Sequence, residues 1–213
     1  MKWALTFLGS SIGKKLLMAI TGLSFVGFLA AHLAGNLTIY GGADAFNSYA
    51  EHLHSLGILL KVAEWGLLLL ALVHVTTGLL LFLENFRSRP VRYQVDRRAG
   101  GRTLGSGTMP YTGALILLFV VYHLLQFHFV DKSGTTIHHI LSNAFSSPLN
   151  VGIYLAAMAV VAVHVSHGFW SLFQTLGLNH PKYAGPIETV GLVLSVVFGA
   201  GFGFIPVYVA LAA

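Results

Sequence analysis

The sequence contains no cysteine among its 213 residues. This absence excludes disulfide bonds, iron–sulfur clusters, thiolate zinc sites and covalent C-x-x-C-H haem attachment. Charge is also scarce, because only 9% of the residues are Asp, Glu, Lys or Arg, and only seven of them are acidic. Such a composition is unlike that of an ordinary soluble domain. Any chemistry must therefore be carried by side chains within apolar segments.

Apolar residues are abundant: 55% of the chain is hydrophobic, and the mean hydropathy is +0.76. Spanning the hydrocarbon core of a membrane takes about 20 residues in a helix. Five segments are long enough, over about residues 16–40, 61–86, 110–130, 150–178 and 187–212. We predict an all-α membrane protein, with one domain over residues 1–213 and five transmembrane helices forming a bundle. No internal repeat or low-complexity segment is apparent, and none is expected.

The basic residues predict the orientation of the bundle. All but Lys61 and Lys132 of the twelve lie before the first span, between the second and third, or between the fourth and fifth. The positive-inside rule then places the N-terminus, the 87–102 connection and the 179–186 turn in the cytoplasm, and the C-terminus outside. The apolar stretch 3–8 is too short for a signal peptide, so we expect a retained cytoplasmic lead-in.

Histidines occur inside four of the five apolar segments. His32 and His123 lie eight residues from the outer ends of their spans, whereas His74 and His164 lie thirteen and fourteen residues in. At a rise of 1.5 Å per residue, these depths are about 12 Å and about 20 Å. Ionisable side chains at such depths mark function. Two histidines at each of two levels is the arrangement that two six-coordinate haems require, because haem iron accepts neutral imidazole on both faces.

Other readings of these histidines remain open. A membrane histidine can hydrogen-bond across helices or line a proton path with no metal present. His167 lies one turn from His164, so it is an alternative ligand or a neighbour of the porphyrin. Gly35, Gly78 and Gly168 follow the histidines by about one turn, and we expect them to leave room for a flat macrocycle. Copper or zinc would need three or four converging ligands, for which no mid-membrane carboxylate is present.

Four stretches of the sequence together resemble a known family. They are SSIGKKLLMAITGLSFVGFLAAHLAGNL, LVHVTTGLLL, GALILLFVVYHLLQF and HVSHGFWSLFQTLGLNHPKY, of which the last is the most specific. The chain resembles the dihaem cytochrome b membrane-anchor subunit of bacterial succinate dehydrogenases and fumarate reductases, a five-helix polypeptide. The resemblance covers essentially the whole chain. It implies two haem b groups, with their iron held by His32/His123 and by His74/His164.

The resemblance also implies a role for the whole complex. The family ligand in the fourth span stands four residues before a glycine that opens a Gly-aromatic run, here Gly168, which selects His164 over His167. Such a subunit anchors a flavoprotein and an iron–sulfur protein on the cytoplasmic face of the bacterial inner membrane. Electrons pass between succinate or fumarate chemistry in those partners and menaquinone in the membrane. This chain itself would carry no dicarboxylate active site.

Polar groups near the haem edges are candidates for quinone and propionate contacts. A quinone site needs a proton-exchanging group beside an apolar slot. Glu51 and His54, with His52, follow the first span and are the quinone candidates. Donors to the propionates of the inner haem are expected at the cytoplasmic edge, at Ser11, Lys14, Lys15, Thr21 and Ser106.

Two other functions fit the same pattern less closely. One is the cytochrome b subunit of another respiratory enzyme, of the hydrogenase or formate dehydrogenase type, whose partner would lie outside. The other is a haem-free, proton-linked transporter that uses its histidines as relays.

Overall fold

The computed structural model describes residues 2–88, 104–178 and 180–212, and these residues form helices without any strand. Five helical segments are long and apolar enough to cross a membrane, as the sequence predicts. In chain order the elements are α1 (Lys2–Gly9), α2 (Ser11–Asn36), the 3₁₀ helix η1 (Leu37–Gly41), α3 (Ala43–Ser55), α4 (Ile58–Arg87), α5 (Leu104–Phe127), α6 (Ile137–Phe145), α7 (Pro148–Thr175) and α8 (Pro181–Ala212).

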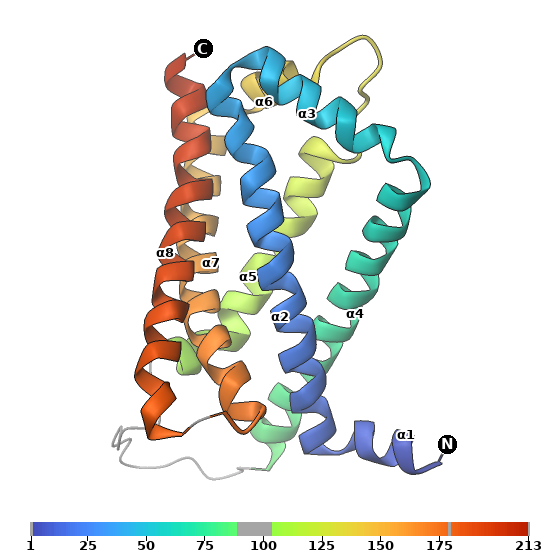
Figure 1. The fold of residues 1–213 in the computed structure, drawn as a ribbon, viewed down its shortest axis with the longest axis vertical. Helices are drawn as coiled ribbons and strands as arrows, with labels where there is room; N and C mark the ends of the chain where they lie inside the picture. The colour runs from blue at the N-terminus through green and yellow to red at the C-terminus, as the bar shows by residue number, and fades with distance from the viewer. Residues whose placement is uncertain (1, 89–103, 179, 213) are drawn as a thin grey trace.

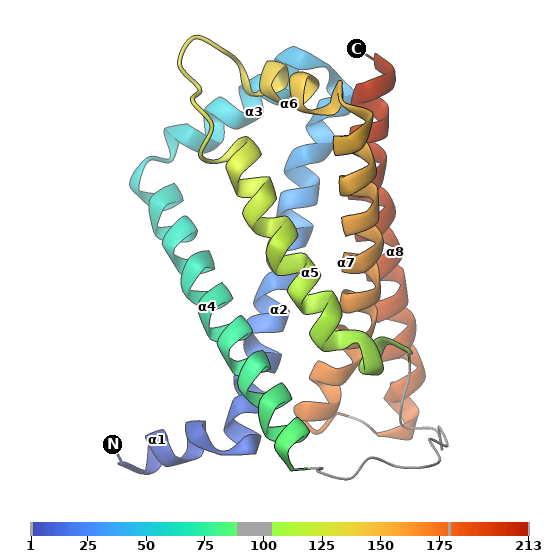
Figure 2. The ribbon, with the colours of Figure 1, turned by 180° about the vertical axis from the view of Figure 1, so that it is seen from behind.

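The five long helices α2, α4, α5, α7 and α8 run along the long axis of the molecule (Figures 1 and 2). The short helices α3 and α6 lie across one end, beside the C-terminus. Helix α1 projects sideways at the opposite end, where α4 finishes. Both views show α4 leaning away from the other helices toward the α3 end. We call the α3 and α6 end the outer end and the α1 end the inner end.

Capping and glycine geometry determine where the chain turns at the two ends. The Ser10 hydroxyl accepts a hydrogen bond from the Gly13 amide at 3.1 Å, which satisfies a free donor in the first turn of α2. A Cβ at Gly13 would collide with the Phe7 carbonyl, so glycine at this position allows the sharp turn between α1 and α2. At the outer end, Gly42 and Gly57 have φ values of 90° and 55°, on either side of α3. Such left-handed backbone conformations favour glycine.

Helix α8 packs closely against α7 and α2. A Cβ at Gly199 would lie 3.0 Å from Cβ of Ala162 in α7, and one at Gly201 would lie 2.9 Å from a methyl group of Leu33 in α2. Small residues allow membrane helices to approach each other closely, where van der Waals contact replaces the hydrophobic effect. Phe198 is 1% exposed at this contact. Helix α8 contains none of the histidines, so it supports the helices that do.

The two connections at the outer end contain helices of their own. Residues 41–60 and 131–149 lie between predicted spans, where no helix is predicted, and they contain α3 and α6. The amide of His138 in α6 donates to the Asn47 side chain of α3 at 3.0 Å, which joins the two short helices. Phe46 and Phe145 are buried beneath them. Both helices are amphipathic and therefore cover the apolar end of the bundle.

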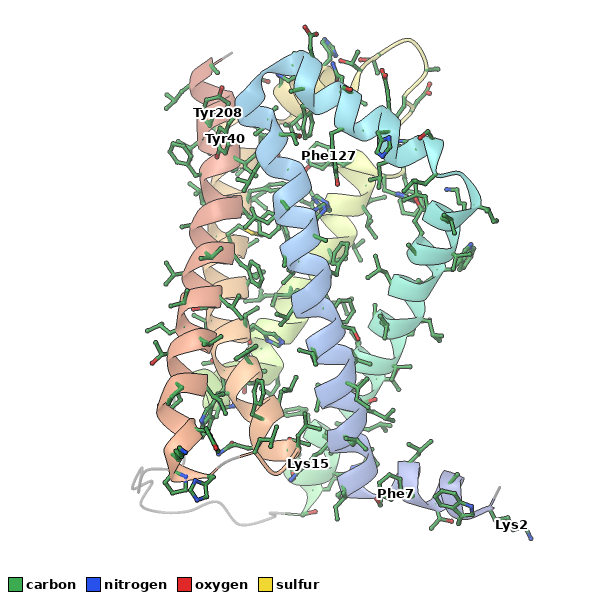
Figure 3. All side chains as sticks on the ribbon, viewed as in Figure 1. Lys2, Phe7, Lys15, Tyr40, Phe127 and Tyr208 are labelled. Atoms are coloured by element: carbon green, nitrogen blue, oxygen red, sulfur yellow. The ribbon has the colours of Figure 1, made fainter. Side chains whose placement is uncertain are left out.

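The described lysines agree with the predicted separation of charge. Lys2 and Lys15 lie at the inner end of the bundle, whereas Tyr40, Phe127 and Tyr208 lie toward the outer end (Figure 3). Lys14 forms an ion pair with Glu84, which joins α2 to α4 at the inner end. The orientation of this end toward the cytoplasm stays a prediction. Residue 179 of the predicted 179–186 turn lies outside the described residues. So do five arginines of the 87–102 connection: Arg89, Arg92, Arg97, Arg98 and Arg102.

Candidate functional site

The structure brings the rings of His32 of α2 and His123 of α5 together in the outer half of the bundle. Their ring centroids lie 6.0 Å apart, with the ring planes at 87°. Imidazole nitrogens lie about 2.0–2.1 Å from a bound zinc ion, so two rings on opposite sides of a metal have centroids about 6 Å apart. The ring of Phe28 stacks on His32 at 5.2 Å, and the ring of Phe202 lies 5.6 Å away. This pair is therefore enclosed by aromatic side chains.

The second pair of histidines lies on α4 and α7. Each imidazole is hydrogen-bonded by a threonine on the preceding long helix. Nδ1 of His74 lies 2.8 Å from the hydroxyl oxygen of Thr21, and Nδ1 of His164 lies 3.0 Å from that of Thr112. His164 is also within electrostatic range of His74. Both threonines are buried, at 4% and 8% exposure, so these contacts are shielded from solvent.

The hydroxyl protons indicate which imidazole nitrogen carries hydrogen. Thr21 donates its proton to the Leu17 carbonyl at 2.7 Å, and Thr112 donates to the carbonyls of Thr108 and Met109 at 3.1 Å. Each oxygen then has a lone pair to offer the imidazole and is able to accept a proton from Nδ1 when the ring is protonated there. A neutral imidazole that is protonated at Nδ1 leaves Nε2 as the free nitrogen. In that tautomer, Nε2 of both residues would be available to a metal.

These contacts reveal an internal repeat in the chain. The motif M-x-x-T-G occurs at residues 18–22 of α2 and again at residues 109–113 of α5. In each copy a histidine follows the methionine by fourteen residues, at His32 and at His123. The partner motif H-V-x-x-G occurs at residues 74–78 of α4 and at residues 164–168 of α7. The expectation that the chain has no internal repeat is therefore wrong.

The repeated residues make equivalent contacts in the two halves. A Cβ at Gly78 would lie 3.5 Å from Cε of Met18, and one at Gly168 would lie 3.8 Å from Cε of Met109. A Cβ at Gly22 would lie 3.7 Å from Cε1 of His74, and one at Gly113 would lie 3.5 Å from Cε1 of His164. In each half, a long helix, a short outer helix and a second long helix follow in order. Parallel repeats of this kind are related by an axis along the membrane normal. The members of each histidine pair are therefore equivalent residues.

The glycines that follow the histidines do not all have the predicted role. The Tyr49 ring and hydroxyl of α3 occupy the space beside Gly35, so this glycine makes room for an outer helix. The expectation that Gly35 leaves space for a macrocycle is wrong. Gly78 and Gly168 face the terminal methyl groups of the two methionines, which are flexible side chains. A short-range pattern could not distinguish these neighbours, because they come from other helices.

A chain of hydrogen bonds extends from His123 to the outer end. The Tyr154 hydroxyl lies 3.2 Å from Nδ1 of His123 and donates to the Gln126 amide oxygen at 2.8 Å. Gln126 donates to the Tyr122 hydroxyl at 2.9 Å, and Tyr122 donates to Asn150 at 2.6 Å. Asn150 in turn donates to the Ala144 carbonyl of α6 at 2.6 Å. Because its own proton goes to Gln126, the Tyr154 hydroxyl is able to accept a proton from Nδ1 of His123, as the threonine hydroxyls are in the deeper pair.

The quinone candidates and the alternative ligand His167 make contacts within their own helices. Glu51, His52 and His54 are exposed on α3, and Nδ1 of His54 bonds to the Ala50 carbonyl of its own helix. Their role toward quinone stays a prediction. The His167 ring lies 6.1 Å from that of Trp170 on the same helix.

Two of the propionate candidates are already engaged in other contacts. The prediction that Thr21 donates to a haem propionate at the cytoplasmic edge is wrong, because its hydroxyl already contacts the Leu17 carbonyl and His74. Lys14 is paired with Glu84. Ser11 and Lys15 are exposed at the inner end, and their role, with that of Ser106, stays a prediction.

Within residues 2–88, 104–178 and 180–212, no three His, Asp or Glu side chains converge on one point that could hold a bare metal ion. Of the deep histidines, His32 and His123 lie ring to ring, and His74 and His164 occupy equivalent positions on α4 and α7. Paired neutral imidazoles without carboxylates form a donor set that suits haem iron, which takes its other four ligands from the porphyrin.

The chain is similar to a known protein over most of its length. It is 27% identical over 184 residues to the succinate dehydrogenase cytochrome b558 subunit of Bacillus subtilis (strain 168), which covers 84% of this chain and 88% of that protein. No family model matches the chain, and no solved structure matches it. The similarity confirms the resemblance predicted from the sequence.

Proposed function

We propose that this chain is the cytochrome b subunit of a bacterial succinate dehydrogenase or fumarate reductase. It holds two haem b groups in the membrane and anchors a flavoprotein and an iron–sulfur protein on its cytoplasmic side. The two haems are held by His32 with His123 and by His74 with His164, through Nε2 of each imidazole. Electrons pass through the chain between those partners and menaquinone.

The pairing of repeat-equivalent histidines is the observation that carries this proposal. A macrocycle between two helices that is ligated by imidazole on both faces needs a histidine from each helix, and the repeat supplies such a pair at each of two levels. The contact between His32 and His123, at 6.0 Å between centroids, fits two ligands of one metal. The hydrogen bonds to Nδ1 of His74 and His164 fit a second pair whose Nε2 atoms are free. The B. subtilis relative, named as a cytochrome b558 subunit, supports the same function.

The chain's own residues would serve electron transfer in three ways. Haem supplies a one-electron carrier when it is bound, and bis-imidazole ligation leaves no open position for oxygen. Aromatic rings around His32 and His123 exclude water from the outer pair. Packing of α8 against α7 and α2 keeps the ligand helices in place. A rigid site of low polarity keeps reorganisation small when an electron arrives.

The proposal is tested on the complex purified from membranes through a tag on this chain. We expect a b-type α-band in the reduced-minus-oxidised absorption spectrum, and co-purification of a flavoprotein and an iron–sulfur protein with succinate dehydrogenase activity. A preparation without an α-band would contradict the proposal and leave the proton-linked transporter. A haem-containing preparation with a hydrogenase or formate dehydrogenase partner would also contradict it.

A further inference from the structure

The deeper histidine pair has one buried hydroxyl for each ligand, and nothing in the function proposed above assigns a role to these hydroxyls. Thr21 and Thr112 lie one turn beyond Met18 and Met109 in the two repeats. Each hydroxyl donates to its own helix and lies within hydrogen-bond distance of Nδ1 of a histidine on the next long helix. The same atom-to-atom contact in both halves, at 2.8 Å and 3.0 Å, argues against an accident of packing.

We propose that Thr21 and Thr112 are positioning residues for the inner haem, which hold His74 and His164 as Nδ1–H tautomers and lower the midpoint potential of that haem. The inference rests on the proposed function, because it concerns residues that act through the haem ligands. A hydrogen bond from the second nitrogen of a ligating histidine fixes its ring orientation and raises its basicity. A more basic imidazole donates more electron density to iron and favours the oxidised form.

In the outer pair, only one of the two histidines contacts a hydroxyl group. Tyr154 takes the Nδ1 proton of His123 at 3.2 Å. On the other side, the Asn36 amide lies 3.4 Å from both ring nitrogens of His32 and is a donor, so it cannot accept an imidazole proton. The inner ligands are thus both fixed by hydroxyl acceptors, and only one outer ligand is. Removing the threonine hydroxyls should therefore affect the inner haem alone.

Redox titration of the purified complex tests the role of the hydroxyls. Thr21→Val and Thr112→Val keep the branched shape of the side chain but remove the acceptor. We expect the complex to retain haem, with a positive shift in the midpoint potential of the inner haem in each variant and a larger shift in the double variant. Thr21→Ser and Thr112→Ser should restore the wild-type potential. The outer haem should titrate unchanged throughout.

A matched control removes a buried hydroxyl elsewhere. Ser195 is 3% exposed on α8, and its hydroxyl donates to the Leu192 carbonyl of the same helix at 2.7 Å. Ser195→Ala should leave both potentials unchanged. If the valine variants lose the inner haem while the serine variants keep it at the wild-type potential, the hydroxyl is required to position the ligands; a shifted potential in the serine variants would overturn the inference.

Three results separate failure of the inference from failure of the function. An unchanged inner potential in valine variants that retain haem would overturn the role of the threonines while the proposed function stands. Loss of the inner haem in both the valine and the serine variants would overturn it too, because the methyl packing rather than the hydroxyl would then be essential. A wild-type complex without haem would overturn the proposed function itself.

Discussion

His32 and His123 face each other across the bundle with their ring centroids 6.0 Å apart, although they come from opposite halves of the chain. They occupy the same position in the two copies of the repeat, as do His74 and His164. The function proposed here depends on this equivalence, because it predicts that each pair forms one site.

Replacing either member of the outer pair should remove the same haem. His32→Ala and His123→Ala each leave one face of the iron without an imidazole, and bis-histidine ligation needs both. We expect each variant to lose about half of the haem and the same component of a redox titration. The double variant should lose no more than either single variant. Loss of different components from the two single variants would refute the pairing.

The fourth span offers two histidines one turn apart, and the structure distinguishes them. His164 is bound by Thr112 of α5, whereas His167 lies by Trp170 of its own helix. We therefore expect His164→Ala to abolish the inner haem and leave the outer one. His167→Ala serves as the matched control and should retain both, as judged by the reduced-minus-oxidised spectrum. Full haem content in His164→Ala would show that the assignment is wrong.

Tyr154 connects the outer ligand to the hydrogen-bond chain that ends at α6. Tyr154→Phe removes the hydroxyl that contacts His123 and donates to Gln126. This hydroxyl belongs to a buried side chain. An unsatisfied buried polar group costs about 1–3 kcal/mol, so the variant should melt at a lower temperature in detergent. Tyr208→Phe, whose ring packs on Tyr40, is the control and should melt like wild type. Equal melting temperatures for all three proteins would argue against the network.

The outer helix α3 is held against α2 through the contact between Gly35 and Tyr49. A methyl group at Gly35 overlaps the Tyr49 ring, so Gly35→Ala should destabilise the protein by about 1–3 kcal/mol, as overpacking does. Gly27, in the same helix, has no neighbour within 4 Å of a Cβ. Gly27→Ala should therefore be neutral or gain up to about 1 kcal/mol from helix propensity.

The cost of Gly35→Ala should disappear when Tyr49 is already Ala, as a double-mutant cycle of thermal unfolding would show. A full cost that persists without the Tyr49 ring would mean that Gly35 is needed for another contact.

The long helices and the depths of their histidines follow from the sequence alone. An uninterrupted apolar segment can satisfy its backbone in a membrane only as a helix or a closed barrel, so its length and position fix the span. The ends are less certain. The third membrane-spanning helix, α5, ends at Phe127, for example, whereas the predicted span continues to Val130. Pairing of His32 with His123 also follows, because equal depth is a property that can be counted along each helix.

The contacts between helices could not be predicted in this way. Thr21 sits among apolar residues at the inner part of its span, and only the structure shows that it reaches His74. The same holds for Tyr49 against Gly35. A signal was present in the sequence, since M-x-x-T-G and H-V-x-x-G each occur twice at nearly constant spacing. It is carried by a few positions in segments of otherwise different sequence, so a search for overall self-similarity misses it.

The haem content of the purified complex tests the pairing of the four histidines most directly. We predict two haem b groups per copy of this chain in the wild type. A single alanine replacement at His32, His74, His123 or His164 should leave one, and the two members of each pair should abolish the same redox component. One haem or none in the wild type, or four variants that do not divide into these two pairs, would contradict the account.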